Sequence, residues 1–420
     1  MLQFDNIPVL LLTGYLGSGK TTLLNRILTN RRGIRFAVIV NDIGEVNIDA
    51  DLIQKGGVVA QQDDNLIALQ NGCICCSLKM DLVQQLRDLC AVNAFDYIVI
   101  EASGICEPAP IAQTICSYPS LSPIADSQLP IPKLDAVVTV VDALRLRDEF
   151  LEQLSPIANS QSPIAPSEDL ASLVVEQIEF CNLILLNKVS EVSEEERMQI
   201  RSIIRAIQPK AQIIDCDYCN VPLGDIIDTQ LFDFEQVATS ATWIQKVEGE
   251  IEEEHHHHDH DHEHCHCKHC QEEHNDEHLN SSQVGLNHSE HHHHNHGDEY
   301  GISTFVYYRR KPLDINRFDE FVARHWPKNV IRCKGMCYFD EEYDMCYLFE
   351  QAGKQFNLKQ AGTFYATMPK EELMQLMARD PMLQRDWDEH YGDRMQKLVF
   401  IGQNMDKHAI IDALDACLIS

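Results

Sequence analysis

The 420-residue chain has little positive charge, few aromatic side chains and no long apolar run. It carries 34 Lys and Arg against 65 Asp and Glu, a formal net charge of −31, and a surface this acidic repels phosphate backbones and anionic lipids. No apolar segment reaches the roughly 18 to 20 residues that a membrane-spanning helix requires. The first residues also lack the basic segment that begins a secretory signal. These absences predict a cytoplasmic protein with no nucleic-acid and no membrane partner.

Sixteen cysteines are too few for a small disulfide scaffold, and in a reducing compartment clustered thiols are better considered as metal ligands. The composition, 44% hydrophobic and 24% charged, is sufficient to bury a core. A chain of this length predicts two domains joined by a linker.

Residues 1–230 alternate short apolar runs with helical stretches. The expected strands are almost continuously apolar, as in parallel strands covered on both faces, and they lie at 7–13, 36–41, 97–101, 136–141 and 183–187. Helices are expected at 21–29, 78–90, 144–154 and 194–207. The alternation predicts an α/β fold with a doubly wound parallel sheet. A Ser- and Pro-rich stretch at 155–168 is expected to be a surface loop.

The composition changes sharply at about residue 248. From 248 to 298 the chain carries 14 Asp or Glu, one Lys and 17 of its 20 His, with few branched aliphatic residues. Such a segment cannot offset its ordering entropy, so 231–300 is predicted to be a disordered, acidic, His-rich linker. Residues 301–420 predict a smaller α+β domain, with strands at 302–308, 330–339, 343–350 and 397–402 and helices at 314–325, 370–378 and 406–418.

The motif Gly14-Tyr-Leu-Gly-Ser-Gly-Lys-Thr fits the phosphate-loop pattern G-x-x-x-x-G-K-[ST]. It lies between a strand and a helix, where backbone N–H groups and the helix N-terminus bind phosphate. Lys20 is expected to reach the β- and γ-phosphates, and the Thr21 hydroxyl to ligate Mg²⁺. The nucleotide-binding residues expected in this loop are Gly14, Gly17, Ser18, Gly19, Lys20, Thr21 and Thr22.

The strand at 97–101 ends in Glu101 and is followed by Gly104. At this position of a phosphate-loop protein a carboxylate faces the Mg²⁺ shell, and a glycine lets the next loop follow the γ-phosphate. Lys20, Thr21 and Glu101 are therefore the expected catalytic residues, and Gly104 is expected to contact the nucleotide.

Asn187-Lys188-Val-Ser190 follows the strand at 183–187 and resembles the guanine-reading N-K-x-D of GTPases. Asn187 and Lys188 are expected to bind the nucleotide. In that motif the Asp accepts two N–H bonds from the base, which one hydroxyl of Ser190 cannot do. The replacement weakens the prediction of guanine, so a different base or a purely structural strand end remain alternatives. Glu191 is a candidate substitute.

Gly72-Cys73-Ile-Cys75-Cys76 places three thiols within four residues, immediately before an expected helix. Thiolates suit Zn²⁺ or Cu(I), and a helix N-terminus lowers thiol pKa values. Three thiolates leave a tetrahedral ion without its fourth ligand. Such an open site is typical of a catalytic metal or of a metal that is transferred to another protein. The other cysteines are expected in the core, with Cys216/Cys219 and Cys333/Cys337 as candidate secondary ligands.

The acidic segment 248–298 is rich in imidazole and thiol side chains. This composition predicts an auxiliary site that binds transition-metal ions and releases them as the pH falls. Tethering such a site raises the local metal concentration. Its candidate ligands are His255, His256, His257, His258, Cys265, Cys267 and Cys270.

Taken together, these motifs resemble the CobW family of metal-chaperone GTPases over nearly the whole chain. The segment 41–49 is similar to that family's N-E/D-x-G-E-V-x-I-D switch, Val141-Asp-Ala to its V-D-A strand end, and Arg332-Cys-Lys-Gly and Leu398-Val-Phe-Ile-Gly to landmarks of its C-terminal domain. Ser190 in place of Asp, and Ala102 in place of Ser or Thr, depart from the family pattern.

The resemblance implies a phosphate-loop GTPase domain, a CobW C-terminal domain, Mg²⁺-dependent GTP hydrolysis and delivery of Zn²⁺, in some members Co²⁺, to a client metalloprotein. It maps Cys73, Cys75 and Cys76 to the metal thiolates and makes Glu45 a fourth or alternative ligand. Nucleotide and metal would then be coupled through 41–49. Alternative interpretations are a cobalt-delivery GTPase for corrinoid synthesis or metallohydrolase activation, and a metal buffer. These patterns identify neither the client nor the oligomeric state.

Overall fold

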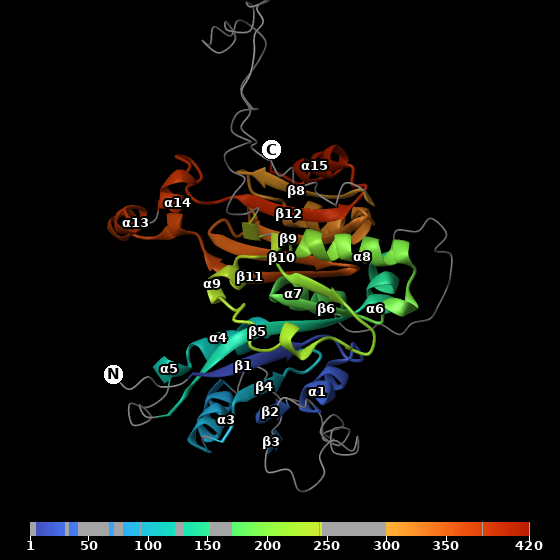
Figure 1. Cartoon of the computed structure of the whole chain (residues 1–420). Coiled ribbons are helices and arrows are strands. Elements are labelled where there is room, and N and C mark those ends of the chain that lie inside the picture. Colours follow the sequence, from blue (N-terminus) through green and yellow to red (C-terminus); the bar gives the residue numbers. More distant parts are fainter. Residues whose placement is uncertain are drawn as a thin grey trace, which may run out of the picture.

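The structure, a computed structural model, describes residues 6–29, 33–40, 67–70, 79–92, 94–121, 129–151, 170–242, 244–245, 300–379 and 381–419. The loop 155–168, the segment 41–49 with Glu45, the cysteine motif 72–76 and the His-rich tract lie outside these residues. The described residues form two β-sheets with helices packed on them (Figure 1). None of the described helices combines the length and the apolar character needed to cross a membrane.

The first sheet has seven parallel strands in the order β3-β2-β4-β1-β5-β6-β7. Their bounds are β1 Asn6–Thr13, β2 Phe36–Val40, β3 Ile67–Gln70, β4 Tyr97–Glu101, β5 Ile131–Asp142, β6 Leu183–Asn187 and β7 Gln212–Asp215. Later strands are added on both sides of β1, which is the arrangement of a doubly wound sheet. The α/β prediction is therefore confirmed. Loops at the carboxyl ends of these strands meet at one edge, where such folds bind ligands.

Helices cover both faces of this sheet because successive strand residues point to opposite sides. Leu10 and Leu12 of β1 pack in one core with α1 (Lys20–Leu28) and the segment 216–227. Val9 and Leu11 pack in the other, with helices α3 (Lys79–Val92), α4 (Pro108–Cys116), α7 (Leu170–Glu179) and α8 (Glu194–Ile207). Shorter helical turns connect them, namely α5 Tyr118–Leu121, α6 Ala143–Leu146, the π-helical Arg147–Leu151, the 3-10 turns Val189–Glu191 and Leu223–Asp225, and α9 Phe234–Ala238.

Two helices of the first domain, α4 and α7, were not predicted from the sequence. Both are more apolar on average than the predicted helices α1, α3 and α8, so their sequences could not be told from buried strands by composition. Within the expected helix at 144–154, α6 passes into a π-helical turn over Arg147–Leu151, and residues 152–154 lie outside the described residues. Part of the expected linker is ordered: Val237 on α9 is buried, and Phe232 packs on the core of the first domain.

The second sheet has five antiparallel strands in the order β11-β10-β9-β12-β8. Its elements are β8 Ile302–Arg309, α12 Ile315–Glu320, the π-helical Phe321–His325, β9 Val330–Cys337, β10 Met345–Ala352, β11 Gln355–Thr363, the 3-10 turn Tyr365–Thr367, α13 Lys370–Met377, α14 Pro381–Arg385, β12 Gln396–Gln403 and α15 Lys407–Asp415. The smaller α+β domain is therefore confirmed. Strand β11 was not predicted, because almost every residue in it is exposed and no apolar pattern marks it.

Helix α7 lies between the two sheets in Figure 1, and residues of both α7 and α8 belong to the apolar cluster that the two sheets share. Ile302, Ile331, Ala352 and Ile401 of the second sheet are buried in the same apolar cluster as Val175 and Ile178 of α7. The two domains therefore share one continuous core at this interface.

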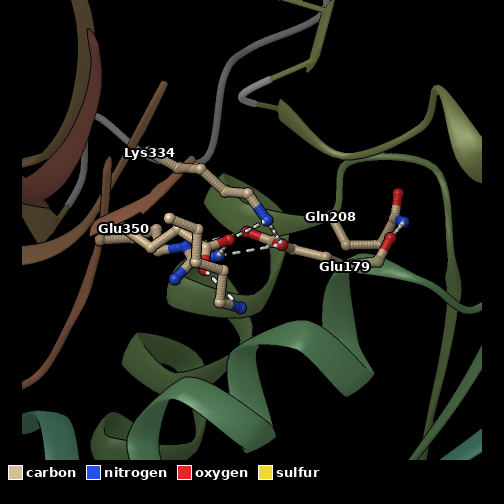
Figure 2. Close-up of polar contacts among 6 residues, drawn as sticks. Glu179, Gln208, Lys334 and Glu350 are labelled. Carbon is tan, nitrogen blue, oxygen red and sulfur yellow. Dashed lines mark hydrogen bonds and ion pairs between the residues drawn. The ribbon is translucent and has the colours of Figure 1, made fainter. Parts of the chain in front are cut away.

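Charged side chains are also buried at this interface (Figure 2). The fully buried guanidinium of Arg332 lies 3.0 Å from a carboxylate oxygen of Glu179. The Lys334 ammonium lies 2.6 Å from Glu350 and 3.6 Å from Glu179. Lys359, at the rim, lies 3.3 Å from Glu350. Glu179 belongs to α7 and the other four to the second sheet, so this interface cluster links the two domains by charge.

Glu176, one turn before Glu179 on α7, faces the same cluster. Its pKa is raised to about 7, chiefly by burial and also by the negative charges of Glu107 and Glu350, against the opposing effect of Arg332 and Lys334. This carboxyl therefore loses its proton near neutral pH and not near its usual value of 4.5.

Removing Glu179 leaves the buried Arg332 without its nearest counter-charge. We expect Glu179→Ala to lower the free energy of unfolding by about 3–5 kcal/mol, because an uncompensated buried charge is costly. The matched control is Glu320→Ala, which breaks the exposed Glu320–Arg324 pair on α12 and should cost no more than about 0.5 kcal/mol. Urea unfolding followed by circular dichroism measures both, and equal losses would contradict a stabilising interface cluster.

The raised pKa of Glu176 makes a pH-dependent contribution with a definite sign. Its folded-state pKa exceeds the unfolded one, so ionisation destabilises the fold as pH rises from about 4.5 through about 7. Glu176→Gln should match the wild type at about pH 4 and exceed its stability by about 2 kcal/mol at pH 8, after allowing for solvent screening. Thermal unfolding at the two pH values tests this, and an equal difference at both would contradict it.

Candidate nucleotide-binding site

The loop between β1 and α1 curls tightly because three of its glycines adopt left-handed backbone angles. Gly14, Gly17 and Gly19 have φ of 136°, 81° and 119°, which side-chain-bearing residues rarely adopt. Gly19 directly precedes α1, and no side chain caps this helix. The loop thus leads into an open helix N-terminus, the geometry that binds a phosphate group.

Neighbouring strands hold this loop closely. A Cβ on Gly14 would lie 2.4 Å from the carbonyl oxygen of Val140 on β5, and one on Gly104 would lie 2.7 Å from the backbone nitrogen of Leu16. The predicted phosphate loop and the loop after β4 are therefore in backbone contact. The Ser18 hydroxyl is buried and has no hydrogen-bond partner among the described residues, so it is left to a ligand.

The expected catalytic residues converge on this loop. The Lys20 ammonium donates to the carbonyl of Tyr15 at 3.3 Å, which holds it within the curve of the loop. The Thr21 hydroxyl donates to Glu101 at 3.3 Å. A hydroxyl and a carboxylate are hard oxygen donors of the kind that Mg²⁺ prefers, so this pair fits the ion.

Asn187 clamps the phosphate loop to the loop after β7. Its side-chain nitrogen donates to the Ser18 carbonyl at 2.8 Å, and its oxygen accepts from the backbone N–H of Cys219 at 3.0 Å. The Cys216 thiol lies 3.8 Å from the same oxygen. Both cysteines are buried, and the hydrogen bond with Cys216 together with burial raises the pKa of Cys219.

Lys188 and Ser190 follow on the same loop. Lys188 has a left-handed φ of 62°, and its ammonium pairs with Asp142 at the end of β5. The Ser190 backbone N–H and hydroxyl both donate to Asp217, at 3.0 and 2.9 Å. Arg26 of α1 completes the contacts, bonding the Tyr218 carbonyl at 2.7 Å.

Sequence reasoning did not identify Gln177 of α7. Its side-chain nitrogen donates to the carbonyls of Gly104 and Cys106, at 3.2 and 3.3 Å, and so ties α7 to the loop after β4. No motif marks this residue, because its partners lie more than 70 positions earlier in the chain.

The structure does not describe the predicted metal ligands. Glu45, Cys73, Cys75, Cys76 and the tract residues lie beyond the described part of the chain. Among the described residues, no group of three or more His, Cys, Asp or Glu could hold a metal ion. Nine of the ten described cysteines, Cys333 and Cys337 included, are buried and all ten are free thiols, as expected for core residues.

Comparison with known proteins agrees with this geometry. The family model "CobW/HypB/UreG, nucleotide-binding domain" matches residues 8–215, and "Cobalamin synthesis protein cobW C-terminal domain" matches residues 302–418. The chain is 32% identical to "Zinc-regulated GTPase metalloprotein activator 1" of Dictyostelium discoideum, over 99% of this chain and 81% of that protein. The chain belongs to the CobW family.

Other relatives match a smaller share of the chain. The chain is 34% identical to "Zinc chaperone YjiA" of Escherichia coli over 56% of this chain and 65% of that protein. It is 30% identical to "Zinc chaperone CobW" of Pseudomonas aeruginosa over 53% of this chain and 60% of that protein. The resemblance inferred from the motifs is thereby confirmed.

The contact between Gly104 and Leu16 yields a test of the site. We expect Gly104→Ala to lower the affinity for a nucleoside triphosphate about tenfold, because its Cβ would push the two loops apart. The control is Gly33→Ala, at φ of 73° with open space around it, which adds backbone strain of about 1–2 kcal/mol without touching the site. Titration with a fluorescent nucleotide measures both, and unchanged affinity in Gly104→Ala would refute the contact.

Proposed function

We propose that this chain is a GTP-hydrolysing metallochaperone that binds Zn²⁺ at Gly72–Cys76 and passes it to a client metalloprotein in a GTP-dependent step. The observation that carries the proposal is the match along almost the whole chain to a relative whose name joins zinc, GTPase and metalloprotein activation. The reducing cytoplasm is the proposed location, since free thiols must stay available to the metal.

The described residues support the nucleotide half of this proposal. The glycine-rich loop and the α1 N-terminus would bind the phosphates, with Lys20 reaching their terminal oxygens. Thr21 and Glu101 would hold Mg²⁺, which supplies charge neutralisation to the phosphates. Asn187 holds the phosphate loop against the loop after β7.

Zn²⁺ is cargo in this proposal. Cys73, Cys75 and Cys76 would hold it through soft thiolates, with Glu45 as a fourth or alternative ligand. The His-rich tract would collect the ion. Thiolate and imidazole also accept Co²⁺, so the choice of ion depends on geometry and supply.

Helix α7 offers a route from the nucleotide to a client docked on the second domain. Gln177 holds the loop that contains Gly104, and Glu179 of the same helix holds the buried Arg332. A loop that orders around the γ-phosphate would therefore act on the domain interface through one rigid helix. The second domain would provide the docking face.

The decisive experiment measures GTP affinity with and without Zn²⁺. If the two ligands are coupled, Zn²⁺ should change the GTP affinity by at least about fivefold, and GTP should change the Zn²⁺ affinity by the same factor. Isothermal titration with a non-hydrolysable GTP analogue and with GDP provides both numbers. Equal affinities with and without the metal would refute a GTP-dependent transfer.

Two variants separate a chaperone from a metal buffer. Lys20→Ala should lose GTP affinity and client activation while keeping its bound zinc. Changing Cys73, Cys75 and Cys76 together to Ser should abolish the coupling while the tract still binds metal. Client activation that survives in Lys20→Ala would favour the buffer.

A further inference from the structure

The guanine-reading position of this chain holds the wrong residue for its task. A carboxylate there accepts from two N–H groups of the base, but the chain has Ser190, whose side chain is a single hydroxyl. In the structure Ser190 is bonded to a carboxylate that comes from elsewhere. Its backbone N–H and its hydroxyl both donate to Oδ1 of Asp217, 27 residues later.

The topology brings these two residues to the base end of the nucleotide site. Strands β6 and β7 are parallel neighbours, with Leu186 beside Asp215, so the loops that follow them lie at the same edge of the sheet. Asn187 bonds to both the phosphate loop and Cys219. Asp217 therefore lies in a loop that is clamped directly to the phosphate loop.

We propose that Asp217 supplies the carboxylate that reads guanine, and that Ser190 holds it in place. The inference rests on the proposed function, because it concerns the base of the same nucleotide. The hydroxyl of Ser190 thus positions the acceptor, and the carboxylate that accepts from the base belongs to Asp217 in the loop after β7.

The hydrogen-bonding capacity of Asp217 fits this role. A carboxylate has about four lone-pair sites, and the two bonds from Ser190 occupy those of Oδ1. Its Oδ2 makes no hydrogen bond with the described residues, and the residue is half-buried. Two acceptor sites thus remain for the two N–H groups on the guanine edge, N1–H and the 2-amino group.

Glu191 is the competing carboxylate, but its position is less favourable. It lies on the 3-10 turn Val189–Glu191, and its exposed side chain makes no hydrogen bond or ion pair with the described residues. Fixing a free glutamate on a ligand costs side-chain entropy. Asp217 is already held by two hydrogen bonds and loses less on binding.

The proposal predicts a change of base preference. Asp217→Asn replaces one acceptor oxygen by an NH₂ donor, which suits the 2-oxo group of xanthine and not the 2-amino group of guanine. We expect GTP affinity to fall about tenfold to a hundredfold and xanthosine triphosphate to become the preferred ligand, as loss of charge-assisted hydrogen bonds implies. Competition titrations with GTP, xanthosine triphosphate and ATP on the full chain measure this.

Two further variants make the test specific. Asp225→Asn removes the same charge from an exposed aspartate eight positions later, whose side chain makes no hydrogen bond or ion pair with the described residues, and should leave base preference unchanged. The double exchange Ser190→Asp with Asp217→Ser restores the ordinary arrangement, and it should return GTP affinity to within about threefold of the wild type.

The outcomes separate this proposal from the proposed function. A wild type that binds GTP, combined with an Asp217→Asn variant that keeps the preference for GTP or loses both triphosphates equally, would overturn the role of Asp217 and leave the GTPase intact. A switch to xanthosine triphosphate in Glu191→Gln would overturn it in favour of Glu191. A wild type that binds no triphosphate would overturn the proposed function itself.

Discussion

The hydrogen bonds on opposite sides of helix α7 are the constraint on which the coupling of the two domains depends. Gln177 and Glu179 are two residues apart, so they point about 200° apart around the helix axis. The first bonds the loop after β4, and the second bonds Arg332 of strand β9 in the second sheet. Because both contacts are buried, neither can be exchanged for water at low cost.

This arrangement limits how the nucleotide site can move. Gly104 lies against the phosphate loop at Leu16, and its carbonyl is held by Gln177. A shift of this loop must therefore either break the bonds of Gln177 or displace α7. Displacing α7 would separate Glu179 from Arg332, and the low dielectric that makes the pair strong also makes its separation costly. The interface cluster thus resists displacement of α7 relative to the second sheet.

The nucleotide site could be predicted from the sequence where its residues are neighbours in the chain. The loop from Gly14 to Thr22, the strand end at Glu101 and the pair Asn187-Lys188 depend on local spacing, and the structure brings them together. Helix α7 and strand β11 were not predicted, because the helix is apolar enough on average to resemble a buried strand and almost every residue of the strand is exposed. The pairing of Glu179 with Arg332 spans 153 residues, and no local pattern encodes such a contact.

Ser190 illustrates how a local motif can mislead when its partner is distant in sequence. The sequence indicated a lost acceptor, whereas in the structure Ser190 donates to the carboxylate of Asp217 in the loop after β7. The need for a firmly held acceptor follows from the charge of the whole chain. A protein with a net charge of −31 repels a polyanionic nucleotide at long range, so affinity must come from short-range contacts. Backbone N–H groups, Lys20 and directional bonds to the base are contacts of this kind, and the same acidic field favours the approach of divalent cations.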